Sequence, residues 1–372
     1  MNTSNEEYLQ EYITTRGLSK KTHKNMYNIT NNYCKFQELS LHELLLEADE
    51  DEEAGLLWKK RRLKKRLVNY MNHLKSTMSI SSAKTYFAVI KTFYIHHEIE
   101  IGKLPSWNFR NASVQEPITY NDLPDRTIIK KAVEMSKPLM RSIILFLSST
   151  GMSKVDMRKL TIKDFIDATM DYHKSTDIKN ALEILNNTTK PIIPIWRKRR
   201  SKTNKYFITF NTSECTSEIL NYLQSRKNLD LSDILFPIPE HYFTLQFEKI
   251  NDALNLGYVG AYRRFRGHML RKFHASNLEK AGMDRYKINV LQGKSNNAVD
   301  DVYFFQDEEE LKKDYIDCMC GLLIFTEVEK INIETEEVQL IKMENEQLRM
   351  EIDEVRRMKE DIEKIKEWYI MD

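Results

Sequence analysis

The sequence predicts a mainly α-helical protein that carries one small β-hairpin and ends in a coiled-coil helix. Glycine and proline are scarce, with 10 and 8 residues in 372, so few tight turns are expected. Apolar residues recur at spacings of three and four along most of the chain, and only one stretch shows paired β-rich runs. The length is too great for one core, so we expect four segments: residues 1–105, 106–119, 120–325 and 326–372.

Residues 1–105 are expected to form a bundle of helices. Ser4 and Ser19 are candidate N-caps, because a serine hydroxyl can accept from the unpaired N–H groups of a helix's first turn. The stretch after residue 40 predicts two helices, one around Leu44–Glu47 and a second from about Glu52. Ser79–His97 predicts another helix with its large apolar side chains on one face.

Residues 106–119 are expected to be a linker, because Gly102, Pro105 and Pro117 interrupt the helical pattern. The segment 120–325 then predicts an α+β domain. Two β-rich runs within residues 192–210 flank a polar, basic stretch, which indicates a hairpin although its turn lacks glycine. The helices expected around it are Asn121–Lys137, 140–150, Ser213–Arg226, Tyr242–Ala253, His268–Ala281 and Arg285–Leu291.

Residues 326–372 carry a heptad pattern. One core position is filled by Ile331, Val338, Asn345, Ile352 and Lys359, and the other by Glu334, Ile341, Leu348, Val355 and Ile362. This pattern predicts four to five heptads of coiled coil, in which Asn345 is the kind of buried polar residue that fixes register. A single amphipathic helix packed on its own domain is the alternative.

The overall net charge of +2 conceals an asymmetry. From Thr326 onward there are 15 acidic and 8 basic residues, a net charge of −7, which leaves +9 on residues 1–325. A basic body suggests a polyanionic partner. No run of 18 uncharged apolar residues and no apolar N-terminal signal are present, so we expect a soluble, cytoplasmic protein without membrane contact. Four scattered cysteines argue against a disulfide framework or a zinc site, and we expect no metal and no cofactor.

Two clusters of basic residues make double-stranded DNA the favoured polyanion. Dense positive charge repels itself unless anions neutralise it, and DNA phosphates do so while releasing counterions. A solvated helix face or a charged loop is the alternative for each cluster. The candidate DNA-binding residues are Lys59, Lys60, Arg61, Arg62, Lys64, Lys65 and Arg66 in the first cluster, Arg197, Arg199 and Arg200 in the second, and Arg266 outside both.

His268 and Arg271 lie three residues apart at the start of a predicted helix, so both can face one point. The N-terminus of a helix also favours an anion, and a phosphate could bind between the imidazole and the guanidinium. With Arg266 and Leu270, these residues resemble the R-x-H-x-L-R box of the tyrosine recombinases. Within the same helix, His274 is expected on the surface.

Three further segments resemble the tyrosine recombinases, and the archaeal integrases in particular. Residues 299–319 resemble the segment that bears the nucleophile, with Tyr303 at its position and Tyr315 expected to pack the C-terminal helix. Residues 147–165 resemble the T-G-x-R-x-x-E-x-x-x-L box, and residues 196–210 the β-hairpin whose lysine precedes threonine, as Lys202 does. The resemblance covers roughly residues 5–325.

The resemblance implies a site-specific DNA recombinase, an integrase that cleaves and rejoins DNA through a 3′-phosphotyrosyl intermediate without metal or ATP. Tyr303 is then the nucleophile, Arg271 and His268 bind the scissile phosphate, and Lys202 is the general acid. The implied architecture is a SAM-like helical core-binding domain, a tyrosine-recombinase catalytic domain and a C-terminal coiled coil. Such enzymes act as homotetramers on paired DNA sites.

Two departures from the family pattern concern the phosphate-binding residues. The T-G-x-R-x-x-E-x-x-x-L box, residues 147–165, is called the first box below. It has Ser153-Lys154 where the family has arginine, and lysine lacks the bidentate guanidinium fork. The second departure is Leu291-Gln292-Gly293-Lys294, where the family has Leu-Gly-His, so that Lys294 takes the place of the histidine. A DNA-binding relative without strand exchange is therefore the alternative function. A type IB topoisomerase is a third, which the short chain disfavours.

Overall fold

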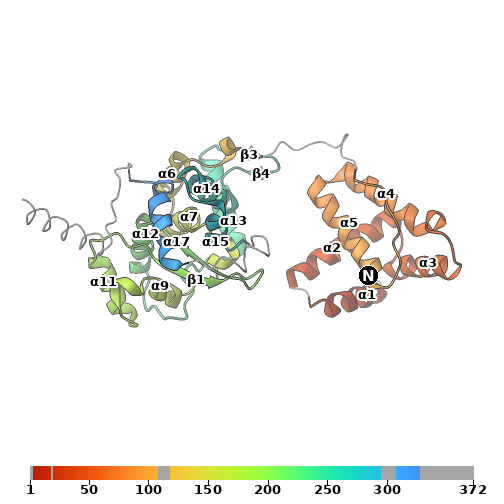
Figure 1. The fold of residues 1–372 in the computed structure, drawn as a ribbon, viewed down its shortest axis with the longest axis horizontal. Helices are drawn as coiled ribbons and strands as arrows, with labels where there is room; N and C mark the ends of the chain where they lie inside the picture. Colours follow the sequence, from red (N-terminus) through yellow and green to blue (C-terminus); the bar gives the residue numbers. More distant parts are fainter. Residues whose placement is uncertain (1–2, 18–19, 108–117, 295–306, 327–372) are drawn as a thin grey trace, which may run out of the picture. The chain divides into compact units, whose positions relative to one another are not determined.

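A computed structural model describes residues 3–17, 20–107, 118–294 and 307–326. The chain divides into two compact units, Met1–Pro117 and Ile118–Asp372, and each is described by itself. The described residues are mainly helical, with two antiparallel sheets of two strands each (Figure 1). This confirms the predicted fold class. The predicted coiled coil falls on residues 327–372, which lie outside the described residues.

The first unit is a helical bundle whose core contains four buried tyrosines, three of which are linked by ring contacts. Tyr33, Tyr70 and Tyr94 are each at most 1% exposed, and the Tyr33 and Tyr94 hydroxyls lie 3.2 Å apart. These rings come from three different helices, so their contacts hold the bundle together. Its elements are α1 (Thr3–Thr15), α2 (Lys20–Gln37), α3 (Leu41–Glu53), η1 (Trp58–Lys60), α4 (Arg62–Thr77) and α5 (Ile80–His96).

The helix expected from about Glu52 is wrong. Helix α3 ends at Glu53, and Gly55 follows with a left-handed φ of +64°, which ends a helix readily because glycine has no Cβ. A short turn at Trp58–Lys60 precedes α4, which begins only at Arg62. The first basic cluster therefore begins in that turn and continues into α4, and does not lie on one helix.

The second unit contains both sheets and most of the helices. The expected helix Asn121–Lys137 is shorter, because Pro124 disfavours helix before it and Asp125 caps the helix from Arg126. The elements are η2 (Tyr120–Asp122), α6 (Arg126–Glu134), α7 (Pro138–Thr150), α8 (Lys154–Met157), α9 (Ile162–Ala168), α10 (Met170–His173), α11 (Ile178–Asn187), β1 (Ile195–Arg199), β2 (Tyr206–Phe210), α12 (Ser213–Gln224), α13 (Glu240–Ala253), β3 (Tyr258–Val259), β4 (Tyr262–Arg263), α14 (Gly267–Lys280), α15 (Arg285–Leu291), α17 (Glu308–Cys318) and η3 (Met319–Gly321).

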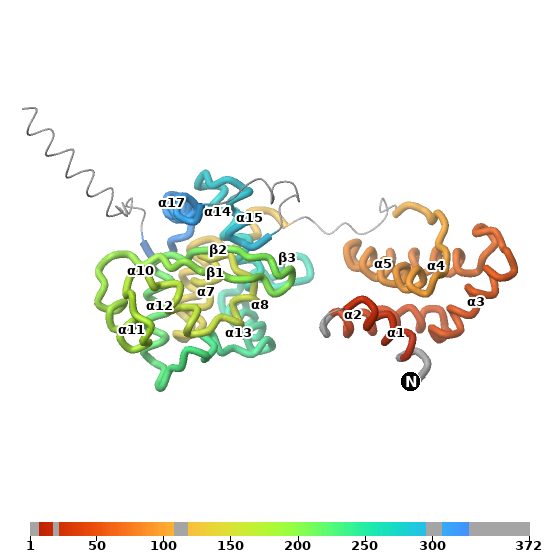
Figure 2. The backbone as a smooth tube through the Cα atoms, turned by 60° about the horizontal axis from the view of Figure 1, so that its bottom comes forward, coloured from red at the N-terminus to blue at the C-terminus, as the bar shows by residue number. Residues whose placement is uncertain are grey.

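Helix α7 lies at the centre of this unit. Every residue from 142 to 150 is buried, as expected for a helix that is apolar on all sides. It packs against α6, α12 and α14 and against β2, and Figure 2 shows it in the middle of this unit, near β2 and α12. Helix α7, whose C-terminal end leads into the candidate site, is therefore fixed by packing against three helices and one strand.

The predicted hairpin is confirmed as β1 and β2, which pair from Ile195↔Phe210 to Arg199↔Tyr206. Its buried end is fixed by Trp196, whose indole N–H donates to the Asn211 side chain over 2.7 Å. Helices α15 and α17 both pack on β2. Tyr315, on α17, is buried as expected and donates to the Ser149 carbonyl over 2.9 Å. These contacts bring the hairpin, α7 and α15 together.

Candidate functional site

The N-terminus of α14 carries the predicted His268 and Arg271. Arg266 precedes the helix with extended backbone (φ −155°), and the helix begins at Gly267. Since His268 and Arg271 follow within the first turns, both line the same cavity, as their spacing predicted. His268 is exposed to solvent, whereas Arg271 is largely buried.

Arg271 is held by two backbone carbonyls. One terminal nitrogen, Nη1, donates to the Gly151 carbonyl over 2.5 Å, and the other, Nη2, donates to the Gln292 carbonyl over 2.7 Å. Burial and the positive charge of Arg200, opposed by Asp156, together lower the pKa of Arg271 to about 10. The guanidinium therefore stays charged at neutral pH. Its bonds join the end of α7 to the end of α15.

Behind Arg271 lies a buried polar pair, Gln292 and His274. The Gln292 amide nitrogen donates to the Arg271 carbonyl over 2.9 Å and lies 3.1 Å from Nδ1 of His274. His274 is 0% exposed, so the expectation of a surface position is wrong. Gly151 is necessary here, because its φ is +61° and a Cβ would lie 2.5 Å from Nδ1 of His274. These residues fix the backbone around the Arg271 guanidinium.

His274 makes the stability of the protein depend on pH. Burial, together with the positive charges of Arg271 and Lys294, lowers the pKa of His274 to about 3. In the unfolded chain the imidazole has its usual pKa of about 6.5. With respect to His274, the protein is therefore most stable above about pH 6.5, and it loses free energy of unfolding as the pH falls from there toward 3. The loss at about pH 5 is about 2 kcal/mol.

Urea unfolding of the wild type and His274→Phe at pH values of about 7.5 and about 5 measures this loss. The wild type should lose about 2 kcal/mol more than the variant, and equal losses would contradict the assignment.

The first box is held together by hydrogen bonds around Asp156. The Ser153 hydroxyl donates to this carboxylate over 2.7 Å and caps α8. The carboxylate also accepts from the backbone N–H of Ser201 over 2.8 Å, which ties the hairpin turn to α8. Lys154 lines the cavity, but its ammonium donates to Glu240 on α13 over 2.9 Å. Its charge is therefore paired within the protein.

The hairpin turn positions Lys202 and Arg200. Asn204 adopts the left-handed φ of +53° that the turn requires, which explains how the hairpin forms without glycine. Lys202 lies in this turn and is exposed. The backbone N–H of Arg200 donates to the Lys205 carbonyl, and its guanidinium donates to the Gly293 carbonyl, each over 2.8 Å. Arg200 lines the same cavity as His268 and Arg271.

The other candidate DNA-binding residues of this unit are Arg197, Arg199 and Arg266, of which Arg266 lines the same cavity. Arg197 forms an ion pair with Glu308 on α17. Arg199 is exposed and donates to the Asn204 carbonyl over 3.2 Å. The Arg266 guanidinium donates to the Arg263 carbonyl and lies 5.2 Å from the centre of the Tyr262 ring.

Two cavities flank the start of α14. The larger, about 570 Å³, is lined by cationic side chains from α8, the hairpin and α14 and by aromatic rings of α13, β3 and β4. The smaller, about 370 Å³, contains Lys294, and His268 and Arg271 line both. The structure thus brings these residues together: Lys154, Arg200, Arg266, His268, Arg271 and Lys294.

The charges of this cluster lower the pKa values of its own members. Partial burial lowers the pKa of His268, and the positive charges of Lys272, Arg266, Arg271 and Lys294 lower it further. Burial also lowers the pKa of Lys294, with Arg271, Arg285 and Arg200 adding to the effect. Such mutual repulsion is relieved when an anion binds. Fixed guanidinium and imidazole groups can therefore bind a phosphate and stabilise negative charge that develops on its oxygens.

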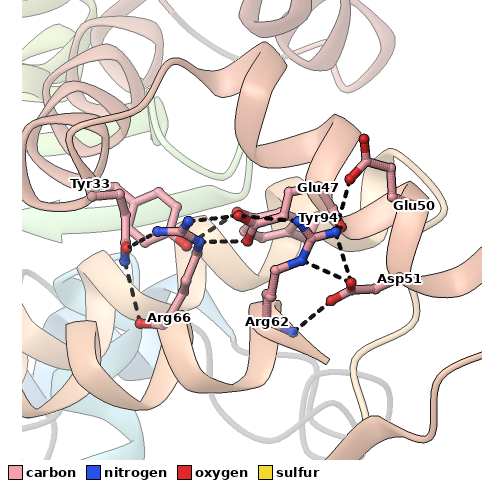
Figure 3. A network of polar contacts seen from close by, with 8 residues as sticks. Tyr33, Glu47, Glu50, Asp51, Arg62, Arg66 and Tyr94 are labelled. Atoms are coloured by element: carbon pink, nitrogen blue, oxygen red, sulfur yellow. Dashed lines mark hydrogen bonds and ion pairs between the residues drawn. The ribbon is translucent and has the colours of Figure 1, made fainter. Parts of the chain in front are cut away.

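The first basic cluster, in the other unit, is partly neutralised by α3. Arg66 donates to Glu47 over 2.6 and 2.7 Å, and Arg62 donates to Asp51 over 2.9 Å (Figure 3). Arg61 pairs with Glu52. The inference that this cluster needs external anions is therefore corrected for its three arginines. Lys59, Lys60 and Lys65 are exposed, and Lys64 is partly exposed.

Tyr303, the predicted nucleophile, lies outside the described residues. Among residues 3–17, 20–107, 118–294 and 307–326, no three histidine, cysteine, aspartate or glutamate side chains are grouped so that they could hold a metal ion. In the same ranges, no helix is long and apolar enough to span a membrane.

The geometry gathers cationic side chains at a helix N-terminus beside a hairpin. A sequence model of the phage integrase family matches residues 126–310. These residues belong to the phage integrase family. The integrase-family domain thus contains the hairpin, α14 and α15, and the resemblance to tyrosine recombinases is confirmed. Among curated proteins, none matches the chain in sequence.

Several solved structures are similar to the chain at low sequence identity. A lambda integrase tetramer bound to a Holliday junction is 15% identical with a TM-score of 0.49, covering 83% of this chain and 82% of that one. The Tn1549 transposon integrase in complex with a circular intermediate DNA is 14% identical with a TM-score of 0.48, covering 83% and 98%. The XerH recombinase bound to a palindromic difH substrate is 15% identical with a TM-score of 0.47, covering 83% and 93%.

Proposed function

We propose that the protein is a site-specific DNA recombinase, an integrase that cleaves and rejoins DNA through a 3′-phosphotyrosyl intermediate on Tyr303. The observation that carries this proposal is the cationic cavity at the start of α14, within a phage integrase family domain. Double-stranded DNA is the substrate, and a homotetramer on paired sites is the working assembly. Both follow from the family's chemistry, which exchanges strands between two duplexes.

Each step uses a residue of the chain. The Tyr303 hydroxyl attacks the scissile phosphorus while the bond from phosphorus to the 5′ oxygen breaks. Arg271 and His268 stabilise the charge that develops on the non-bridging oxygens. Because its pKa is lowered, His268 is neutral at pH 7 and can accept the tyrosine proton. Lys202 donates a proton to the leaving 5′ oxygen, and religation reverses these transfers. The phosphodiester energy is kept in the covalent intermediate, so no nucleotide is consumed.

Covalent trapping tests this proposal. The full-length protein is incubated in EDTA with nicked duplexes from the flanks of its own gene, and adducts are resolved on a denaturing gel. A nick beside the cleavage position lets the short fragment that carries the freed 5′ hydroxyl diffuse away, so the adduct accumulates. We expect an adduct with wild-type protein and none with Tyr303→Phe, which lacks the attacking oxygen.

The alternative function is DNA binding without strand exchange. The Lys154–Glu240 ion pair favours it, because this pair neutralises the cation that lies beside the family's arginine position. If the protein shifts these duplexes on a native gel and forms no adduct with any of them, that alternative replaces the proposal. An adduct that persists in Tyr303→Phe would assign the nucleophile to another residue.

The lysines of the first basic cluster are proposed to contact DNA phosphates, whereas its arginines stabilise the fold. Lys65→Gln should lower affinity for duplex DNA and reduce the slope of log affinity against log salt by about 0.9. Arg66→Gln removes the same charge one residue later but breaks the bonds to Glu47, and should lower the free energy of unfolding by about 1–3 kcal/mol. Fluorescence anisotropy across a salt series and urea unfolding separate the two effects. Equal effects of both variants on the salt slope would contradict this division.

A further inference from the structure

The family position for the first arginine holds no available guanidinium in this chain. Ser153 occupies it together with Lys154, and the Ser153 hydroxyl is used to cap α8. The Lys154 ammonium is bonded to Glu240 and lies 5.6 Å from the centre of the Phe243 ring. Arg158, one turn further on, pairs with Glu240 and donates to the Ile238 carbonyl, and it lines neither cavity. A phosphate bound by Arg271 would therefore lack a second guanidinium from this segment.

Arg200 lies in the same cavity and comes from a different element. It follows β1 and lines the cavity with Ser153, His268 and Arg271. Among the described residues, no carboxylate lies within ion-pair distance of its guanidinium, in contrast to Lys154. Its charge contributes to the lowered pKa values of Arg271 and Lys294, as expected for neighbouring cations.

Both ends of Arg200 are fixed. Its backbone N–H and carbonyl close the hairpin turn, through Lys205 and Asn204, and its Nη1 is bonded to the Gly293 carbonyl. That bond uses one of the five N–H donors of a guanidinium, so donors remain for an anion. A side chain held in this way loses little conformational entropy when a phosphate binds.

We propose that Arg200 supplies the second guanidinium for the scissile phosphate, in place of the arginine missing from the first box. The hairpin then contributes two functions, a phosphate ligand at Arg200 and a proton donor two residues later at Lys202. Lys154 instead fixes α8 to α13. This role rests on the proposed recombinase function, whereas the anion-binding property of Arg200 is independent of it.

Binding of inorganic phosphate to the full-length protein tests the anion site without any DNA. We expect Arg200→Gln to weaken binding at least about tenfold, since a hydrogen bond to a charged group contributes this much. Lys154→Gln should change binding by less than about twofold, because Glu240 already neutralises this lysine. Arg285→Gln is a matched control that removes one positive charge from an exposed residue near Lys294 that lines neither cavity. Titration followed by ³¹P NMR gives the affinities, and thermal unfolding verifies that the variants fold.

Cleavage substrates with a neutral linkage test the catalytic role. A methylphosphonate at the scissile position lacks the negative charge that a second cation would stabilise. Arg200→Ala should therefore form adduct on the order of a hundredfold more slowly than wild type on a phosphate substrate, and approach the wild-type rate on the methylphosphonate. If Arg200 had a purely structural role, Arg200→Ala would slow adduct formation on both substrates alike. Arg200→Lys would not distinguish a structural from a catalytic role.

The two experiments fail in different ways. Unchanged phosphate binding in Arg200→Gln, with loss in Lys154→Gln, would overturn the assignment of Arg200 even if wild-type protein forms the adduct. If wild-type protein forms no adduct, the recombinase proposal fails, while the phosphate titration still decides whether Arg200 is part of an anion site.

Discussion

Replacing Arg271 with alanine is expected to lower the rate of covalent adduct formation by about three orders of magnitude. Loss of one preorganised donor to a developing oxyanion costs about 10²–10³-fold, and Arg271 can offer two in a fixed plane. Single-turnover measurement on the nicked substrate gives the rate directly. Arg271→Lys should keep the charge without the fork and recover only part of the loss.

Arg271→Ala should also destabilise the domain, because the Gly151 and Gln292 carbonyls lose their donor. Arg264 is a matched control for this effect. Its guanidinium likewise donates to backbone carbonyls, those of Asn121, Asp122 and Leu123, but it lines neither cavity. Arg264→Ala should therefore lower stability and leave the cleavage rate of folded protein unchanged. Comparable rate losses in both variants would show that Arg271 acts only through the fold.

Gly151→Ala is expected to lower the free energy of unfolding by about 3 kcal/mol or more. The left-handed backbone alone costs a non-glycine residue about 1 kcal/mol. The added Cβ would also lie 2.5 Å from Nδ1 of His274 and 2.9 Å from the Gln292 amide nitrogen, in a place where neither side chain has room to move. Urea unfolding measures the loss.

Gly257→Ala separates the two contributions to this effect. Gly257 has a similar φ of +68°, but a Cβ there would meet nothing within 4 Å. It should therefore lose only about 1 kcal/mol. If Gly151→Ala were no worse than Gly257→Ala, the packing of His274 against Gly151 would be looser than the structure indicates.

The sequence was most informative where local spacing decides structure. His268 and Arg271 share the start of α14, and α15 spans Arg285–Leu291 as expected, because capping and helical spacing act over a few residues. His274 could also have been found, since it lies four residues from both Leu270 and Leu278 on a buried stripe. Its polar side chain obscured this pattern.

The parts that sequence reasoning missed depend on contacts between distant residues. The Lys154–Glu240 pair joins residues 86 positions apart, and no local pattern reveals it. The arginines of the first cluster are neutralised by carboxylates of α3, which a charge count within the cluster does not include. Helices α8 to α11 and the hairpin of β3 and β4 are short, and their apolar residues do not repeat often enough to indicate a period.

The double attachment of Arg271 affects how related sequences should be interpreted. Because its guanidinium joins the ends of α7 and α15, selection for a stable domain would retain this arginine even in a descendant that no longer cleaves DNA. His268 has no hydrogen-bond partner among the described residues, so stability places little constraint on it. Loss of His268, rather than of Arg271, would therefore be the earlier mark of a lineage that has abandoned strand exchange.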